Sequence, residues 1–316
     1  MIPHLDFKLK DSPVEHVLTR EQDGVSLHIK REDLLHLKVS GNKFRKLKYN
    51  LAEAKKQGHT RLLTYGGAFS NHISAVAAAG KLMGFETLGI IRGEELGNNI
   101  EKTFSQNPTL KFAASQGMKF HFVTRSEYRE KESLTFSEDL KKQHGDFYLV
   151  PEGGTNLLAV KGCEEILTNE DKNFDFVCCP VGTGGTISGL INSSREHQHI
   201  LGFSALKGDF LNEEIKKYTS AKNWNLITDF HFGGYAKVTP ELVHFINTFR
   251  SKYDILLDPV YTGKMLFGIF DMMEKEAFPQ NSRILAVHTG GLQGIAGMNR
   301  FLEKKNFPLI DVEDEI

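Results

Sequence analysis

The chain has 316 residues, of which 40% are hydrophobic and 25% are charged, so it can form one large domain or two of ordinary size. A formal net charge of −1 excludes the strong overall field of a typical nucleic-acid-binding protein, and no apolar run approaches the length that spans a bilayer. Three cysteines, two of them adjacent, argue against a disulfide framework and indicate a reducing cytoplasm, and the lack of CxxC and HExxH patterns predicts no metal site.

Helical and strand-like segments alternate along the chain. A helix is predicted just after Gly41, because Phe44, Leu47 and Leu51 recur at three- and four-residue steps. Strands are predicted at 60–67, 86–93, 118–125, 147–154, the start of 175–194, 199–206, 225–232, 255–261 and 283–291, with helices at 70–84, 98–117, the end of 175–194, 240–253 and 264–278. This order predicts an α/β fold with two parallel-sheet domains. The smaller domain, 51–155, is inserted into the larger one, 1–50 and 156–316.

The first predicted helix begins with an unusual cluster of cations. Lys43, Arg45 and Lys46 lie in its first turn, where the positive end of the helix dipole favours acidic residues instead. A solvated charged face would explain this arrangement. Alternatively, one lysine is a nucleophile whose pKa is lowered by the helix end and its neighbours, or it forms an imine with an anionic cofactor.

A second motif, VGTGGTISG at 181–189, joins a predicted strand to a predicted helix. Gly182, Gly184 and Gly185 allow backbone N–H groups to converge, and Thr183 and Thr186 add hydroxyl donors, which suits a phosphate. The motif has neither the lysine of a P-loop nor the spacing of a dinucleotide-binding GxGxxG loop. A tight turn with nothing bound is the alternative.

A third motif, YGGAFSNHISA at 65–75, again joins a strand to a helix. Ser70 and Asn71 fall at the helix start, where their side chains and the local N–H groups suit a carboxylate. The simpler alternative is that Ser70 only caps the helix.

Two tyrosines and two threonines are predicted near strand ends, where ligands of α/β proteins bind. Tyr235 follows two glycines, Tyr261 and Thr262 of LLDPVYTGK (256–264) are expected just beyond a strand, and Thr289 stands in a Thr-Gly-Gly turn. Packing or turn formation also explains each of them.

Together, a lysine at an odd helix start, a phosphate loop, a carboxylate site and two tyrosines indicate pyridoxal phosphate. Lys43 would then be the lysine that binds the cofactor as an imine. The cysteines, Cys163, Cys178 and Cys179, are expected in the core.

The motifs also resemble those of the 1-aminocyclopropane-1-carboxylate deaminase and D-cysteine desulfhydrase family. The matching stretches run in order along nearly the whole chain: KREDLLHLKVSGNKFRKL (30–47), YGGAFSNHISAVAAAGKLMG (65–84), PEGGTN (151–156), VGTGGT (181–186), LLDPVYTGK (256–264) and VHTGG (287–291). The resemblance implies the tryptophan synthase β-like fold, fold type II of the pyridoxal phosphate enzymes. It also implies a homodimer that acts on a small amino acid.

The resemblance carries over to individual residues of this sequence. It implies that Lys43 bears the Schiff base and that the loop Gly182–Thr186 holds the phosphate. It further implies that Ser70, Asn71 and His72 grip the substrate carboxylate, with Asn71 also contacting the cofactor. Tyr235 and Tyr261 match the two active-site tyrosines and join Lys43 and Ser70 as expected catalytic residues.

Two positions favour one branch of the family. The deaminases tend to carry Glu and Leu where this chain has Thr262 and Thr289, and we expect both threonines to contact the cofactor. Hydroxyl groups leave the pyridine ring closer to neutral, which suits removal of an α-proton by Lys43 followed by expulsion of a thiol. We therefore expect a lyase or hydrolase of the D-cysteine desulfhydrase type, which forms pyruvate, hydrogen sulfide and ammonia.

Other functions remain as alternatives. Ring opening of 1-aminocyclopropane-1-carboxylate to 2-oxobutyrate and ammonia is the closest. A non-catalytic small-molecule-binding protein would have no need of the amine of Lys43. A dinucleotide oxidoreductase is disfavoured by the glycine spacing, and a serine or threonine dehydratase by the setting SGNKFRKL.

Overall fold

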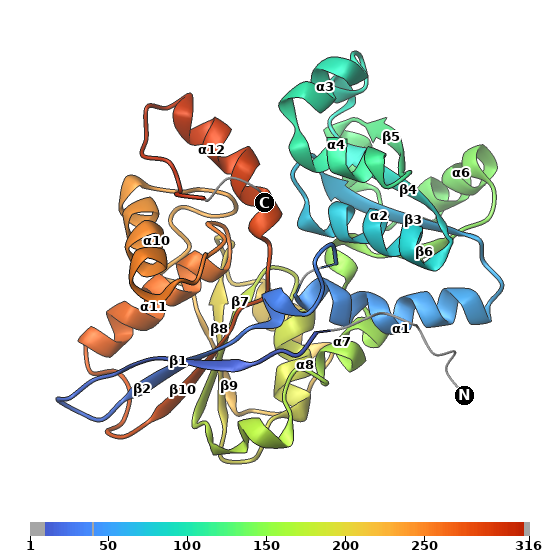
Figure 1. Ribbon diagram of the computed structural model, residues 1–316. Coiled ribbons are helices and arrows are strands. Elements are labelled where there is room, and N and C mark those ends of the chain that lie inside the picture. The colour runs from blue at the N-terminus through green and yellow to red at the C-terminus, as the bar shows by residue number, and fades with distance from the viewer. Residues whose placement is uncertain (1–9, 40, 313–316) are drawn as a thin grey trace.

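The computed structural model describes residues 10–39 and 41–312, and within them the strands form two sheets in separate lobes (Figure 1). The larger sheet has the order β1-β2-β10-β7-β8-β9 and the smaller one β5-β4-β3-β6. The strands are β1 (Val14–Thr19), β2 (Ser26–Lys30), β3 (Arg61–Gly67), β4 (Glu86–Arg92), β5 (Lys119–Val123), β6 (Tyr148–Val150), β7 (Phe176–Val181), β8 (His199–Ser204), β9 (Trp224–Ile227) and β10 (Arg283–Val287).

Helices cover both sheets, so the predicted α/β class is confirmed. They are α1 (Asn42–Lys56), α2 (Asn71–Met83), α3 (Ile100–Gln106), α4 (Pro108–Ser115), α5 (Arg125–Arg129), α6 (Leu134–His144), α7 (Leu157–Cys163), α8 (Gly185–Ser193), α9 (Leu211–Lys216), α10 (Pro240–Tyr253), α11 (Thr262–Glu274) and α12 (Ile295–Glu303). None of the helices in the described ranges is long and apolar enough to cross a membrane.

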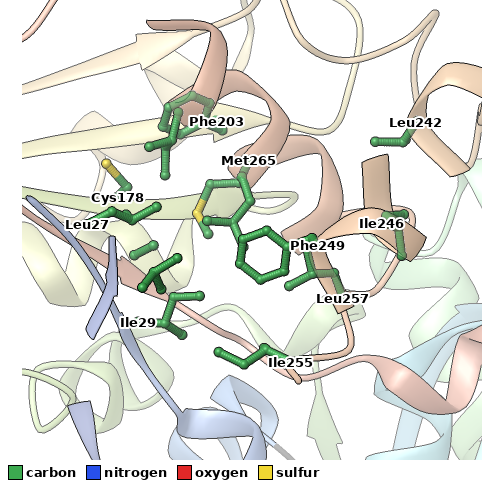
Figure 2. Close-up of a cluster of buried hydrophobic side chains, with 14 of the residues drawn as sticks. Leu27, Ile29, Cys178, Phe203, Leu242, Ile246, Phe249, Ile255, Leu257 and Met265 are labelled. Atoms are coloured by element: carbon green, nitrogen blue, oxygen red, sulfur yellow. The ribbon is translucent and has the colours of Figure 1, made fainter. Parts of the chain in front are cut away.

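The larger sheet is covered on both faces, because successive side chains of a strand point to opposite sides. Cys178 of β7 lies in the hydrophobic cluster with α10 and α11, whereas its neighbours Val177 and Cys179 lie in the cluster with α8. Figure 2 shows the first cluster, in which Leu27 of β2 and Met265 of α11 are among the labelled side chains. The three cysteines are buried and free, as the sequence analysis expects.

The smaller sheet is entirely parallel, and its register aligns the ends of three strands. Gly67 of β3 pairs with Arg92 of β4, which in turn pairs with Val123 of β5. The loop from β3 to α2 therefore starts at the carboxyl edge of this sheet, next to the ends of its neighbours. Asn107, which caps α4, donates from its Nδ2 to the carbonyl of Ala68 at 2.9 Å and braces that loop.

The domain borders stay a prediction. Helix α1 runs across residue 50, where one border is predicted, and its apolar residues Phe44, Leu47 and Leu51 lie in the hydrophobic cluster of the smaller sheet. Figure 1 shows α1 close to this lobe, with α7 next to it.

Three parts of the fold differ from expectation, two in the larger lobe and one in the smaller lobe. The antiparallel pair β1–β2 at one edge was not predicted. The run 255–261 is not a strand, because Asp258 accepts backbone N–H groups of Tyr261 and Thr262 and folds the chain into a turn before α11. The predicted helix 98–117 is two helices, α3 and α4, because Pro108 forces Asn107 into an extended conformation.

Candidate active site

The start of α1 is held between two turns of the larger lobe. Gly41, at φ 62°, has its backbone against the carbonyl of Thr289, and a Cβ there would lie 2.0 Å from that oxygen. The Asn42 amide donates to Thr186 Oγ1 at 2.8 Å. Only glycine fits at position 41, because any side chain would collide with the Thr289 carbonyl. This close approach and the Asn42 hydrogen bond place Lys43 beside the turn after β10 and the start of α8.

Lys43 is a partly exposed residue whose amine has an unusual acidity. The pKa of Lys43 is lowered to about 7, first by burial and then by the positive charge of Lys46, while Asp258 opposes the change. Within the described ranges its Nζ has no hydrogen-bond partner. The amine is therefore available for chemistry, and the lowering has the direction expected from the sequence, although burial is its largest cause.

Lys46, one turn further along α1, was missed by the sequence analysis. Its side chain is 2% exposed, and its Nζ donates to Gly153 O at 3.1 Å, Thr155 Oγ1 at 2.9 Å and Thr183 Oγ1 at 3.2 Å. Burial lowers its pKa. The spacing of three residues from Lys43 places both lysines on one side of the helix, and that spacing was the available signal.

The loop between β7 and α8 forms a narrow cradle. Gly184 has a φ of 81°, and a Cβ at Gly182 would lie 3.1 Å from Tyr261 Cε1. A Cβ at Gly185 would lie 2.8 Å from Thr155 Oγ1. The hydroxyls of Thr155 and Thr183 are 2.5 Å apart. Converging hydroxyls, the buried Lys46 ammonium and the first N–H groups of α8 suit an anion such as a phosphate.

The start of α2 brings a second set of polar groups together. Ser70 caps the helix, accepting from Ile73 N at 3.4 Å, as the simpler alternative predicts. Asn71 Oδ1 is buried without a partner in the described chain, and its Nδ2 would lie 2.9 Å from a Cβ at Gly291. A buried amide oxygen left unpaired is costly, which marks a position where a ligand completes the hydrogen bonding.

His72 differs from its two neighbours. It is buried, its Nε2 lies 2.8 Å from Thr64 Oγ1, and its Nδ1 is unpaired in the described chain. Burial and the charges of Lys43 and Lys46 hold its pKa well below the ordinary value, so the imidazole is neutral.

The two tyrosines contact each other across two segments of the larger lobe. Tyr235 stands in a loop after Gly234, Tyr261 caps α11, and their ring centroids are 6.2 Å apart in a T-shaped arrangement. Desolvation raises the pKa of each hydroxyl, although Tyr235 is 48% exposed, so both stay protonated at neutral pH. Lys264, also missed by the sequence analysis, holds the Tyr235 loop by donating to the carbonyls of His231 and Gly234, each at 2.9 Å.

The two threonines that separate the branches differ in their surroundings. Thr262 is fully buried, and its Oγ1 accepts from the backbone N–H of Asp258 at 2.9 Å. Thr289 is 6% exposed. Its hydroxyl has no hydrogen-bond partner in the described ranges. Thr289 therefore has a hydroxyl to offer to a ligand, whereas Thr262 uses its own within the turn.

Asp258 is the acidic group of this site, and the sequence analysis missed it. Its carboxylate accepts N–H bonds from Tyr261 at 2.6 Å and Thr262 at 3.1 Å, and burial raises its pKa to about 6. Its Cγ would lie 3.3 Å from a Cβ at Gly291. The side chains of Asp258 and Asn71 thus both lie against the glycine turn at Gly291. No group of three His, Cys, Asp or Glu side chains in the described residues is arranged to hold a metal ion.

Comparison with known proteins gives consistent results. The model of the family described as pyridoxal-phosphate dependent enzyme matches residues 8–290. The Arabidopsis thaliana bifunctional D-cysteine desulfhydrase/1-aminocyclopropane-1-carboxylate deaminase, mitochondrial, is 31% identical over 86% of this chain and 74% of its own. The D-cysteine desulfhydrase of Salmonella typhimurium is 25% identical over 92% of this chain and 94% of its own. A solved structure described as an ACC deaminase homologue has a TM-score of 0.73 and 26% identity, covering 90% of each chain.

These matches confirm the expected relationship and fold, and they leave the substrate open. Names from both branches occur among the relatives, so similarity does not separate desulfhydrase from deaminase. The expectation of a hydrolase is not supported. The chain belongs to the pyridoxal-phosphate-dependent enzyme family, and pyridoxal phosphate is its cofactor.

Proposed function

We propose that the protein removes the thiol and the amino group from D-cysteine, forming pyruvate, hydrogen sulfide and ammonia with the uptake of one water molecule. The observation that carries this choice is the unpaired hydroxyl of Thr289, at a position where the deaminases carry Leu. Thr262, where the deaminases carry Glu, supports the same choice because its side chain is uncharged. Its hydroxyl is already hydrogen-bonded within the turn before α11.

The residues of the site fit pyridoxal phosphate. The amine of Lys43 suits the aldehyde, and the loop Gly182–Thr186 with the Lys46 ammonium suits the phosphate. The unpaired Asn71 Oδ1 leaves a buried acceptor beside the glycine turn at Gly291 that a bound cofactor can satisfy. When bound, the cofactor supplies an electron sink for the bonds that break at the amino acid.

Each polar residue then has a defined task. Ser70, Asn71 and the N–H groups at the start of α2 bind the substrate carboxylate, and the unpaired Nδ1 of the neutral His72 is the remaining predicted contact. Lys43, with a pKa of about 7, is substantially neutral at physiological pH and removes the α-proton. Tyr261 and Tyr235 stay protonated and therefore can donate a hydrogen bond to the departing sulfur.

The alternative reaction is ring opening of 1-aminocyclopropane-1-carboxylate. That substrate has no α-proton, so Lys43 would have no proton to remove at the α-carbon, and a tyrosine would have to take another part. Membership of an enzyme family does not favour the non-catalytic binding protein.

Two measurements test the proposal. Borohydride reduction of the purified, cofactor-loaded protein should attach the cofactor to Lys43, as read by peptide mass mapping, and Lys43→Ala is the control. Hydrogen sulfide released from D-cysteine is then compared with 2-oxobutyrate formed from 1-aminocyclopropane-1-carboxylate. Turnover of the second compound alone would show that the threonine argument is wrong.

The assembly and location rest on resemblance and composition alone. We propose a homodimer in the cytoplasm, without nucleic-acid or membrane partners. Light scattering coupled to size-exclusion chromatography should give a mass near twice that of the 35.6 kDa chain.

A further inference from the structure

A cavity of about 480 Å³ lies at the carboxyl edge of the smaller sheet, and nothing in the proposed chemistry uses it. Carboxyl edges of parallel sheets are where α/β proteins bind ligands. The cavity is lined by the loop 67–69 and by Arg92, Glu95, Arg125, Tyr128 and Arg129.

The strand register creates this cavity. Gly67, Arg92 and Val123 are paired in one row across β3, β4 and β5, so three loops leave the sheet side by side. A Cβ at Gly67 would lie 3.7 Å from Arg92 Nη2. Because position 67 has no side chain, the guanidinium of Arg92 is left uncovered on that side.

The charges that line the cavity are mostly positive. Arg125 is paired with Glu95 at 2.8 Å, whereas Arg92 and Arg129 have no hydrogen bond or ion pair to any side chain in the described ranges. The hydroxyl of Tyr128 donates to Glu152 at 2.7 Å, which holds its ring 5.7 Å from the Arg92 guanidinium. Two arginines without acceptors suit the planar, two-oxygen geometry of a carboxylate or a phosphate.

The cavity adjoins the proposed carboxylate site along the chain. The loop 67–69 that lines it leads directly into Ser70 and Asn71 at the start of α2. The pKa of Tyr235 responds to two charges near this cavity, since Glu152 raises it and Arg92 lowers it. A small amino acid with its carboxylate at Ser70 can therefore direct its side chain toward Arg92.

We propose that this cavity is a subsite for an acidic group on the side chain of the substrate, read by Arg92 and Arg129. This inference rests on the proposed function, because it needs the substrate carboxylate at Ser70. D-cysteine is then the smallest member of a substrate class whose other members carry a negatively charged substituent. A free anion is the other source of the same chemistry, and the test separates the two.

The test compares acidic amino acids with their neutral isosteres on the cofactor-loaded protein. Dissociation constants of aspartate and asparagine, and of glutamate and glutamine, are measured by calorimetry for both enantiomers. We expect the acid to bind at least tenfold more tightly in one pair, and Arg92→Gln to reduce this ratio below threefold. Arg125→Gln, whose guanidinium is already paired, should change the ratio less than Arg92→Gln, and Arg129→Gln gives a second reading of the subsite.

Several results would overturn the subsite. Equal affinity for acid and amide in every pair is one, and a preference that survives both Arg92→Gln and Arg129→Gln is another. Arg92-dependent binding of inorganic phosphate without any amino-acid preference would assign the cavity to a free anion instead. Failure of D-cysteine to release hydrogen sulfide would reject the proposed function, whereas the calorimetric ratio is read without turnover.

Discussion

The acidity of Lys43 makes a quantitative prediction for the protein from which the cofactor has been removed. With a pKa of about 7, roughly three quarters of the Lys43 amine is neutral at pH 7.5, against about 0.1% for the ordinary value of 10.5. In reductive methylation only the neutral amine reacts with the aldehyde reagent. The pH dependence of labelling at Lys43, followed by mass spectrometry, should therefore have its midpoint near pH 7, with the exposed Lys56 as the internal reference for the reagent.

Replacing Lys46 separates the two causes of this acidity. Lys46→Met removes the neighbouring positive charge and leaves the burial, so the midpoint should rise by about one pH unit while staying below that of a free lysine. Thr155→Val is the matched control, because it removes a hydrogen-bond partner of Lys46 but keeps the charge. A wild-type midpoint near pH 10, or no rise in Lys46→Met, would refute the reasoning.

The same pKa fixes the sign of a stability effect. Between pH 7 and 10.5 the unfolded chain holds the Lys43 proton that the folded chain has lost, so the contribution of Lys43 to the free energy of unfolding should increase with pH in this window. Chemical denaturation at several pH values should show a smaller increase for Lys43→Met. An unchanged pH dependence in that variant would contradict the lowered pKa.

Three further predictions concern the loops. Lys264→Met should lower the free energy of unfolding by about 1–3 kcal/mol, because the carbonyls of the Tyr235 loop lose their charged donor. In the same variant kcat should fall more than cofactor affinity. Equal losses in both would argue against a role of Lys264 in placing Tyr235. Gly185→Ala should weaken cofactor binding about tenfold in a spectroscopic titration, since the new methyl group crowds Thr155, and an unchanged affinity would place the phosphate elsewhere. The double variant Thr289→Leu, Thr262→Glu should slow release of hydrogen sulfide from D-cysteine, and an unaltered rate would remove the basis for choosing this branch.

The interior strands were predictable because burial on both faces leaves continuous apolar runs bounded by glycine. Thus 60–67 corresponds to β3 and 283–291 begins with β10. The edge pair β1–β2 escaped prediction, since its sequences VEHVLT and SLHIK mix charged and apolar residues. The run 255–261 misled for the opposite reason: it is apolar, but Pro259 lacks an N–H and Asp258 turns the chain.

The site was predictable where a motif is local and not where contacts are long-range. The glycine loop after β7 and the start of α2 can each be recognised from a motif of about ten consecutive residues. Lys46 and Lys48 are indistinguishable in the sequence, yet Lys46 lies under the cradle whereas Lys48 pairs with Glu165 at the surface. Likewise, no local pattern shows that the Thr262 hydroxyl is hydrogen-bonded within a turn while the Thr289 hydroxyl stays unpaired.

The contacts of Lys46 have a consequence for how the molecule is assembled. Its ammonium joins α1 to chain segments 107, 109 and 137 residues further on. Closing loops of that length costs more entropy than forming the local contacts within each lobe, so we expect this junction to form late in folding. A growing polypeptide therefore cannot complete its anion-binding centre until the segment after β7 has been synthesised.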